Sequence, residues 1–302
     1  TILDPACRSR WSPNHKKKHC LRTYERLESR FDPYLTKLKI IENNIFGVDI
    51  EPMAVEISRL RAWLSLIVDE QEGRQIEPLP NLDFKFVCAN SLVPLDDSEI
   101  DMFNDHELHQ KLADIRTRYF NARKPHTKKE LQKKYYKLKN AASTLFDNLR
   151  TKQLKSFDPF RNSYPSEFFD TDQMFGVSGF DIIIGNPPYG ETVDLNTKSF
   201  RAIYKSTEGK FEIYKYFMER ALILASPKGT IALITPATWL TLGYFNKIRR
   251  IVLTECSILQ ISNTIDKAFD SATVNTVVFI LKKGQTSNKT LLVSDELFTK
   301  TE

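Results

Sequence analysis

The stretch DIIIGNPPYG, residues 181–190, joins an apolar run to an asparagine, two prolines and a tyrosine. Proline lacks a backbone N–H, so a strand ends at Pro187 and Pro188 and continues as a stiff turn. That turn offers two acceptors, the Asn186 side-chain oxygen and the Pro187 carbonyl, which can hold both hydrogens of an exocyclic amine. The Tyr189 ring can stack on a planar heterocycle drawn out of a duplex. We interpret the motif as a site for amine chemistry, with a simple proline turn as the alternative.

Two other apolar runs also end in polar side chains. GVDI ends one run with Asp49, and a carboxylate there accepts hydrogen bonds from two ribose hydroxyls or caps the next helix. FVCANSL ends another run with Asn90 and Ser91. An amide can read an adenine edge because it donates and accepts together, and it also forms turns. Both readings of both segments stay open on these residues alone.

The cysteine pattern favours neither a disulfide framework nor a metal centre. The four cysteines are Cys7, Cys20, Cys88 and Cys256, and none of them forms a CxxC pair. We therefore predict no metal site.

Short β-branched runs that alternate with helical patterns must position these side chains. The runs read as strands and are NIFGVDI, FKFVCAN, FDIIIGN, TIALITP, ILQIS and TVVFILKK. Between several of them lie helical patterns such as PMAVEISRLRAWLSLIV and EIYKYFMERALILA. This alternation predicts an α/β fold with a doubly wound, mostly parallel sheet, which binds ligands at the carboxyl ends of its strands.

The pattern that follows GVDIEP predicts a helix with Pro52 in its first turn. Its apolar rhythm selects a core-facing side whose members are Ala54, Ile57, Leu60, Arg61 and Leu64, extended by Trp63 and Leu66. We read these residues as packing residues.

Charge separates one part of the chain from the rest. The net charge is +6, yet the segment 121–155 holds eleven Lys or Arg against two acids, so the other residues sum to about −3. It lies within a charged, helical region, residues 96–175, which we predict to be an insertion in a domain that spans residues 1–302. The segment is either a solvated helix face or a surface that contacts nucleic-acid phosphates. No run is long and apolar enough for a membrane span, so we expect a cytoplasmic protein.

The motifs together resemble those of the γ-group N6-adenine-specific DNA methyltransferases, and most closely the methylase portion of type IIG restriction-modification enzymes. The resemblance covers nearly the whole chain and rests, in order, on TILDPAC, IIENNIFGVDIEPMAVEISRLRAWLSLIVDEQ, LPNLDFKFVCANSL, GFDIIIGNPPYG, KFEIYKYFMERALIL, GTIALITPATWL and AFDSATVNTVVFILKK. It implies a Rossmann-like fold, S-adenosylmethionine as cofactor and double-stranded DNA as partner.

The resemblance also assigns roles to individual residues. Asp4 and the backbone of Ala6 are expected to contact the methionine end of the cofactor, Asp49 its ribose, and Ile50 and Asn90 its adenine, with Ser91 alongside. The target base is expected to lie against a catalytic set that comprises Asn186, Pro187, Pro188, Tyr189 and, from a later loop, Phe269.

The sequence departs from the family pattern near its start, where DPACRSRWS places Arg8 and Arg10 in a segment that needs glycine for a tight turn. This departure favours an alternative, a catalytically decayed fragment with at most nonspecific DNA binding. A further alternative keeps the motif and changes the substrate to RNA guanine or protein glutamine. We also expect the chain to be truncated at both ends, with target-recognition and nuclease regions elsewhere in a longer protein.

Overall fold

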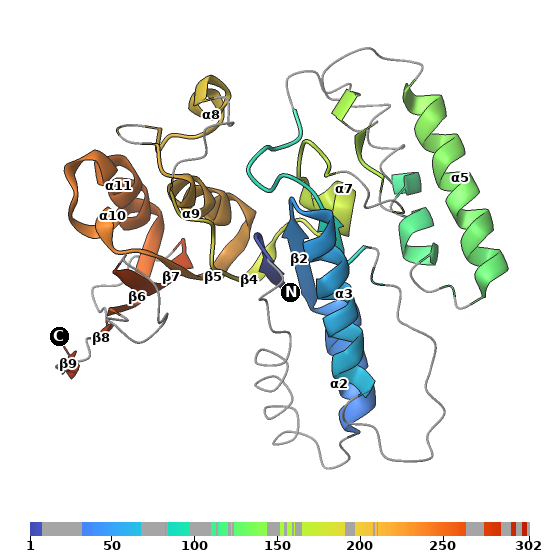
Figure 1. The fold of residues 1–302 in the computed structure, drawn as a ribbon, viewed down its shortest axis with the longest axis horizontal. Coiled ribbons are helices and arrows are strands. Elements are labelled where there is room, and N and C mark those ends of the chain that lie inside the picture. Colours follow the sequence, from blue (N-terminus) through green and yellow to red (C-terminus); the bar gives the residue numbers. More distant parts are fainter. Residues whose placement is uncertain are drawn as a thin grey trace. The chain divides into compact units, whose positions relative to one another are not determined.

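A computed structural model gives the fold of the chain in two compact units. It describes residues 1–7, 32–67, 82, 84–96, 110–112, 114–119, 122, 124–143, 152–153, 156–158, 160, 165–190, 197–207, 209, 211–263, 275–284, 291–293 and 298–300. Unit 1 comprises residues 1–6 and 178–302, and unit 2 comprises residues 7–177. Figure 1 labels the helices and strands along the chain.

Unit 1 is built on a mixed sheet with the strand order β1, β4, β5, β7, β6, β8, β9. The bounds are β1 Ile2–Asp4, β4 Phe180–Gly185, β5 Ala225–Pro236, β6 Cys256–Asn263, β7 Thr276–Lys283, β8 Leu291–Val293 and β9 Phe298–Lys300. β1, β4 and β5 are parallel neighbours, whereas β7 runs antiparallel to both β5 and β6. The predicted strands and the α/β class are confirmed, and the carboxyl ends of β1, β4 and β5 share one edge.

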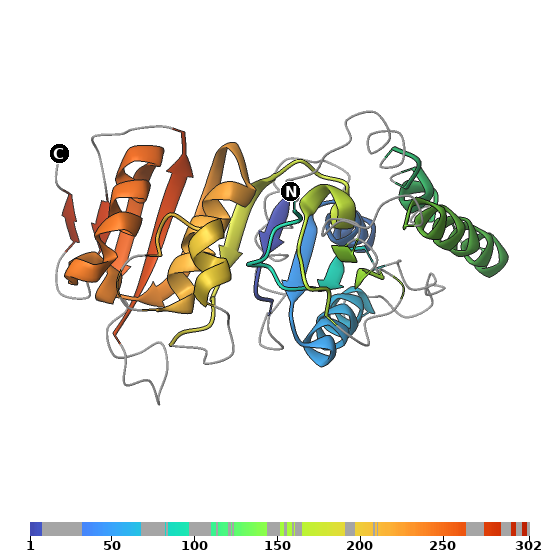
Figure 2. The same cartoon turned by 90° about the horizontal axis from the view of Figure 1, so that it is seen from above.

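Helical segments of unit 1 connect the strands of this sheet (Figure 2). They are α8 Thr197–Ile203, α9 Ile213–Leu224, α10 Thr238–Thr241, the 3₁₀ turn η1 Gly243–Phe245 and α11 Asn246–Glu255. α9 contacts β5, α11 contacts β6, and the two helices contact each other. Almost every residue of α9 is buried, including Glu219, whose carboxylate accepts the backbone N–H groups of Lys205 and Ser206 at 2.8 Å each. These bonds hold the segment that follows α8.

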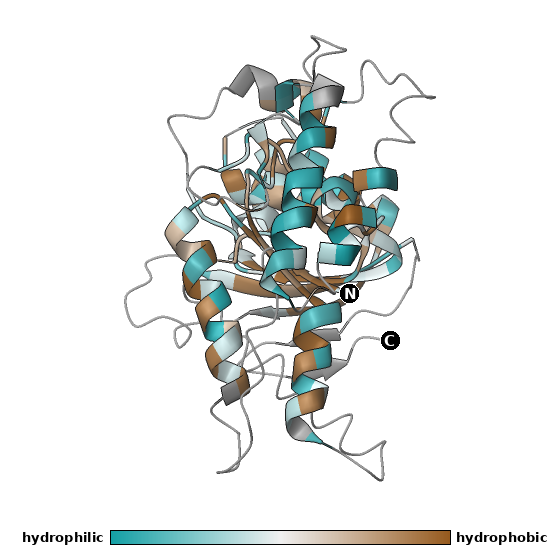
Figure 3. Cartoon of the chain, turned by 90° about the vertical axis from the view of Figure 1, so that its right-hand side faces the viewer, coloured by the Kyte–Doolittle hydropathy of each residue, from teal (hydrophilic) through white to brown (hydrophobic). Residues whose placement is uncertain are grey.

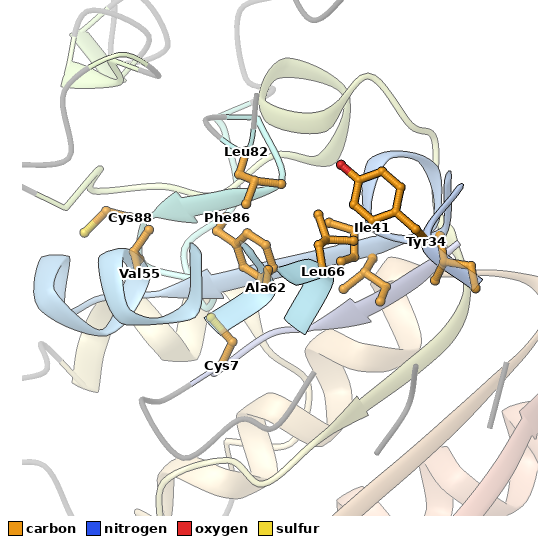
Figure 4. Close-up of a cluster of buried hydrophobic side chains, with 11 residues drawn as sticks. Cys7, Tyr34, Ile41, Val55, Ala62, Leu66, Leu82, Phe86 and Cys88 are labelled. Carbon is orange, nitrogen blue, oxygen red and sulfur yellow. The ribbon is translucent and has the colours of Figure 1, made fainter. Parts of the chain in front are cut away.

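Unit 2 contains the parallel strands β2 Ile45–Asp49 and β3 Phe86–Cys88. Its helices are α2 Pro33–Asn43, α3 Pro52–Ile67, α5 Pro125–Ser143 and α7 Thr171–Phe175. Side chains from α2, α3 and both strands form one buried cluster (Figure 4). Alternate residues of a strand face opposite sides, and Phe46 packs against Phe175 of α7 at 5.0 Å between ring centroids. β2 therefore has apolar contacts on both faces, which explains its unbroken apolar run.

The structure corrects the predicted core face of α3. Leu60 is 51% exposed and Leu64 is 43% exposed, and Arg61 is also exposed. The buried line comprises Val55, Ser58, Ala62 and Ser65, together with Ala54 and Leu66, which the prediction had placed in the core. The two serines tolerate burial because their hydroxyls donate to carbonyls of their own helix, at 2.8 Å to Ala54 and 2.6 Å to Ala62. These small side chains let α3 lie close to the strands.

Helix α5 lies in the charged region where the sequence predicts helices, and an aromatic cluster anchors it. Tyr135 and Leu131 are 7% and 4% exposed, and the Tyr135 ring lies 5.3 Å from that of Phe160. The Phe160 ring also packs on Phe84 at 5.6 Å and on Tyr119 at 4.8 Å. α5 is thereby packed against the segment that leads into β3. None of the described helices combines the length and the apolar composition that crossing a membrane requires.

Candidate functional site

The turn that carries Asn186 and Tyr189 follows the last residue of β4. Asn186 is exposed, Pro187 is buried, and Pro188 and Tyr189 are half-buried. The Tyr189 hydroxyl donates to the Asn186 side-chain oxygen at 2.7 Å and lies 3.2 Å from the Ile234 carbonyl of β5. The amide oxygen of Asn186 is thus oriented by a side chain of the same motif, and it keeps acceptor capacity because an amide oxygen has two lone pairs.

The Tyr189 ring is supported by residues that the motif itself does not include. Tyr214, at the start of α9, packs edge-on against it with centroids 6.4 Å apart. The Tyr214 hydroxyl lies 2.9 Å from Thr238 Oγ1, and burial raises the pKa of this phenol. The backbone N–H of Ile213 also donates to the Gly190 carbonyl at 3.3 Å, so α9 is tied to the end of the turn. The segments KFEIYKYF and TPATWL, both part of the family resemblance, supply Tyr214 and Thr238.

Asp4 lies beside the start of the same turn. β1 and β4 pair in register, with Leu3 opposite Ile183, so both strands end at one edge. Asp4 is 3% exposed, and its Oδ1 accepts the backbone N–H of Ala6 at 3.2 Å. A Cβ added at Gly185 would lie 3.1 Å from that oxygen. Unit 1 therefore brings Asp4 and Ala6 close to the beginning of the Asn186 motif, and a glycine makes the approach possible.

In unit 2 the corresponding strand ends carry Asp49 and Ile50. Asp49 is 7% exposed, and its Oδ1 accepts the backbone N–H of Glu51 at 2.9 Å, just ahead of α3. Its own carbonyl accepts the N–H of Ala89 at 2.9 Å, which continues the ladder between β2 and β3. Ile50, by contrast, is 53% exposed. The Asp49 carboxylate thus holds the N–H of the residue just ahead of α3, and the apolar side chain of Ile50 is exposed directly after it.

Asn90 follows β3 and forms a comparable turn. Its side-chain oxygen accepts the Leu92 N–H at 3.1 Å, and its backbone N–H donates to the Ser166 carbonyl at 2.9 Å. Its amide nitrogen Nδ2 has no partner in the part of the chain that the structure describes, although the side chain is only half-exposed. Ser91 is 5% exposed. The Asn90 side chain therefore builds the turn with its oxygen and keeps its nitrogen as a donor.

The thiol between these strand ends is inert. Burial, together with the charges of Asp49 and Glu51, raises the pKa of Cys88 to about 12. The protonated thiol lies 3.5 Å from the Ile50 carbonyl, to which it donates. Cys88 is a packing residue and not a nucleophile at neutral pH. Among the described residues, no cluster of three or more His, Cys, Asp or Glu has the arrangement of a metal site.

Each unit therefore assembles part of the predicted residue set. Unit 1 holds Asp4, Ala6 and the Asn186 motif, and unit 2 holds Asp49, Ile50, Asn90 and Ser91. Phe269, Arg8 and Arg10 lie outside the described residues. The sequence reading missed Tyr214 and Gly185 as residues that support the turn, because both read as ordinary members of a helix and a strand.

Comparisons with known proteins all find methylases or methyltransferases. A family model described as Eco57I restriction-modification methylase matches residues 43–269. RM.MjaORFECS2P of Methanocaldococcus jannaschii, whose name assigns it to the type II restriction enzymes and methyltransferases, is 26% identical over 97% of this chain. The adenine-specific methyltransferase BrxX of Escherichia coli O9:H4 is 23% identical over 94% of this chain. The chain spans only 30% and 25% of the length of these two relatives.

A solved structure shows the same fold. The ATP-dependent type ISP restriction-modification enzyme LlaBIII, solved bound to DNA, superposes with a TM-score of 0.56 at 10% identity. The match covers 97% of this chain and 17% of that enzyme. At this identity the likeness concerns the fold alone.

Proposed function

Because this chain belongs to the Eco57I restriction-modification methylase family, we propose that it transfers a methyl group from S-adenosylmethionine to N6 of adenine in double-stranded DNA. The observation that carries the proposal is the turn after β4, where an exposed Asn186 amide oxygen is oriented by Tyr189 beside the buried Asp4. A simple proline turn needs neither that hydrogen bond nor the close approach of Asp4 to Gly185.

The family resemblance assigns residues of each unit to one part of the cofactor. In unit 2, the buried Asp49 carboxylate would accept from the ribose, the exposed Ile50 side chain would lie against the adenine, and Asn90 Nδ2 would donate to its edge. Ser91 would complete this turn. In unit 1, Asp4 and the backbone of Ala6 would bind the methionine end. When bound, S-adenosylmethionine supplies the methyl group, on a sulfonium that makes it electrophilic.

The chain's own part in the chemistry is to position an amine. The lone pair of an exocyclic amine is delocalised into its ring, so the amine is a weak nucleophile. Asn186 Oδ1 and the Pro187 carbonyl would accept its two hydrogens and so favour a tetrahedral nitrogen. These hydrogen bonds strengthen as positive charge develops on nitrogen, and they therefore favour the transition state over the ground state. The rest of the rate enhancement comes from orientation.

The aromatic residues would hold the target base outside the duplex. Flipping a base costs a few kcal/mol, which stacking on an aromatic ring offsets. Tyr189 is braced for this by Tyr214 and by its own hydroxyl, so little side-chain entropy remains to be lost. Phe269 would supply a second ring; it is proposed here from the family resemblance, since it lies outside the described residues.

The proposal extends to a longer protein. Since the chain spans less than a third of the two relatives, target recognition and DNA cleavage would be the work of other regions. Such a protein would act in the cytoplasm, where chromosomal DNA and the cofactor meet.

The test is a methyl-transfer assay of the 302-residue chain with labelled S-adenosylmethionine and three acceptors, duplex DNA, transfer RNA and a glutamine-containing peptide. We expect label in duplex DNA, recovered as N6-methyladenine after digestion to nucleosides. Label in transfer RNA or in the peptide would assign the motif to the other substrate classes.

Calorimetric binding of S-adenosylmethionine tests the remaining alternative, a decayed fragment. The chain is compared with a variant that carries Arg8→Gly and Arg10→Gly, two positions outside the described residues. Binding by the unchanged chain supports the proposal. Binding by the glycine variant alone would identify a disabled copy of a methyltransferase.

A further inference from the structure

One strongly charged surface takes no part in the site described above. Helix α5 carries Lys129, Lys133 and Lys137 at intervals of four residues, and all three side chains are exposed. Residues four apart lie on the same side of a helix, so the three ammonium groups form one row. Lys134 is exposed next to this row. Figure 3 shows the hydrophilic outer side of α5 facing the viewer.

The side chains of these four lysines are exposed to solvent. None of them makes a hydrogen bond or a salt bridge in the part of the chain that the structure describes. The one acidic residue of the helix, Glu130, lies 3.9 Å from His126. The row is therefore a concentration of net positive charge in a segment, residues 121–155, that carries eleven basic residues against two acids.

The opposite side of α5 is held firmly. Leu131 and Tyr135 are buried in the aromatic cluster with Phe84 and Phe160. The Lys139 ammonium on this side donates to the Phe157 carbonyl, and the Tyr136 hydroxyl, beside the row, donates to Asp158 at 2.9 Å. Burial lowers the pKa of Lys139, which belongs to the anchoring side. These contacts fix the orientation of α5, so the lysine row always faces solvent.

The spacing of the row matches a nucleic-acid strand. With a rise of 1.5 Å per residue, the backbone from Lys129 to Lys137 spans about 12 Å. Phosphates of one DNA strand are spaced by about 3.4 Å along the duplex axis, so the row faces about three to four of them. Lysine stems are flexible and carry point charges, which suits contacts to phosphate rather than to base edges.

We propose that the lysine row of α5, residues 129, 133 and 137 with Lys134 beside it, binds the phosphate backbone of duplex DNA independently of sequence. The inference rests on the proposed function. It names the surface that would hold DNA without reading its sequence. Because the aromatic cluster ties α5 to Phe84, just ahead of β3, DNA bound there is fixed relative to unit 2.

The test measures binding of the 302-residue chain to fluorescent DNA duplexes of unrelated sequence, without cofactor, between 50 and 200 mM salt. The test variant combines Lys129→Gln, Lys133→Gln and Lys137→Gln, since glutamine keeps helix propensity. Loss of three phosphate contacts is expected to weaken binding by roughly 10- to 100-fold for every duplex and to reduce the salt slope by about 3.

Two control variants test whether DNA binding depends on the lysine row itself or only on the net charge of the chain. A matched variant removes the same charge at three exposed lysines elsewhere, Lys39, Lys205 and Lys228, and is expected to bind almost as the unchanged chain does. A second variant replaces the row by arginine and is expected to retain binding. Far-UV circular dichroism and thermal unfolding confirm that each variant folds.

Several results would overturn the inference. These are no binding of duplex DNA by the unchanged chain, equal losses in the test and matched variants, and an unchanged salt slope in the test variant. Tighter binding of duplex RNA than of duplex DNA would assign the surface to RNA instead. DNA binding that depends on the row, in a chain that transfers no methyl group, would overturn the proposed function and leave this inference standing.

Discussion

The ends of β2 in unit 2 and of β4 in unit 1 look alike in sequence and differ in how their polar side chains are used. Asp49 is 7% exposed and accepts a backbone N–H of the next turn. Asn186 is exposed and is bonded to a side-chain hydroxyl, that of Tyr189. The first side chain builds the local fold, and the second is only oriented by it. Substitution should therefore affect stability at one strand end and chemistry at the other.

The largest expected effect is at Asn186. Asn186→Ala should lower methyl transfer by about 10³-fold, because one of two acceptors for the amine is lost in the transition state. The free energy of unfolding should change by less than about 0.5 kcal/mol, since the side chain is exposed and Tyr189 also lies 3.2 Å from the Ile234 carbonyl. Single-turnover kinetics and urea unfolding measure the two. Unchanged turnover would remove Asn186 from the catalytic set.

Asp49→Ala should lower both the stability of the protein and its affinity for the cofactor. Removal of the acceptor for the Glu51 N–H is expected to cost about 1 kcal/mol of stability. Loss of the ribose contact should weaken binding of S-adenosylmethionine by roughly 10- to 100-fold, since hydrogen bonds to a charged group contribute about 1.5–3 kcal/mol. Asp49→Asn is the control, because it keeps the turn and removes the charge. Full cofactor affinity in Asp49→Ala, measured by calorimetry, would contradict the assignment.

Two glycines test how tightly the two strands are packed, one in the middle of β2 and one at the end of β4. A Cβ at Gly47 of β2 would lie 2.8 Å from Phe86 Cδ1 and 3.0 Å from Cys7 Sγ, inside the buried cluster. Gly47→Ala should therefore destabilise the protein by about 1–3 kcal/mol. At Gly185 the nearest atom is Asp4 Oδ1 at 3.1 Å, so we expect a loss of about 1 kcal/mol for Gly185→Ala.

The control for both glycines is Gly243→Ala, since a Cβ at Gly243 would meet no atom within 4 Å. Its urea unfolding should match that of the unchanged chain. A greater loss of stability for Gly185→Ala than for Gly47→Ala would show that β4 is packed more tightly at Gly185 than β2 is at Gly47.

The smallest expected effect is a pH dependence that both units share. Burial lowers the pKa of Lys85 in unit 2 and of Lys215 in unit 1 to about 8. Between pH 8 and the ordinary lysine pKa of 10.5, the unfolded state binds more protons, so the free energy of unfolding rises with pH. Each lysine contributes up to about 1.4 kcal/mol per pH unit.

The pH range in which the effect of these two lysines can be measured ends near pH 9. The pKa of Cys88 is raised to about 12 and that of Cys256 to about 11, so above pH 9 the unfolded state loses thiol protons first, and this loss offsets the stabilisation that the two lysines contribute. We expect Lys85→Met and Lys215→Met each to remove about half of the rise between pH 8 and pH 9 in urea unfolding. An equal rise in the unchanged chain and in both variants would show that these lysines are not the cause.

Much of the fold could be predicted from local pattern. Each short apolar run became a strand, because β-branched residues suit an extended backbone and the turn residues beside them end it. The strand ends at Asp49, Asn90 and Asn186 lie where the sequence placed them. Strand direction could not be read in this way: the run that forms β7 lies antiparallel between β5 and β6, since its apolar residues pack equally well in either direction.

The side of α3 that faces the core likewise could not be predicted from the local sequence pattern. The apolar rhythm selected Leu60 and Leu64, and the strands instead receive Val55, Ser58 and Ala62. Periodicity identifies a helix and its faces, but which face is buried depends on how closely the neighbouring strands approach, and small residues permit the closest approach.

The sequence by itself determined the strands, the helices that follow them and the polar residues at the strand ends, because each depends on neighbours along the chain. Only the tertiary structure decided how those residues are used. It braced Tyr189 with Tyr214, placed Asp4 against Gly185, and turned the lysine row of α5 outward by burying Tyr135. Each of these depends on distances between segments remote in sequence, which packing sets.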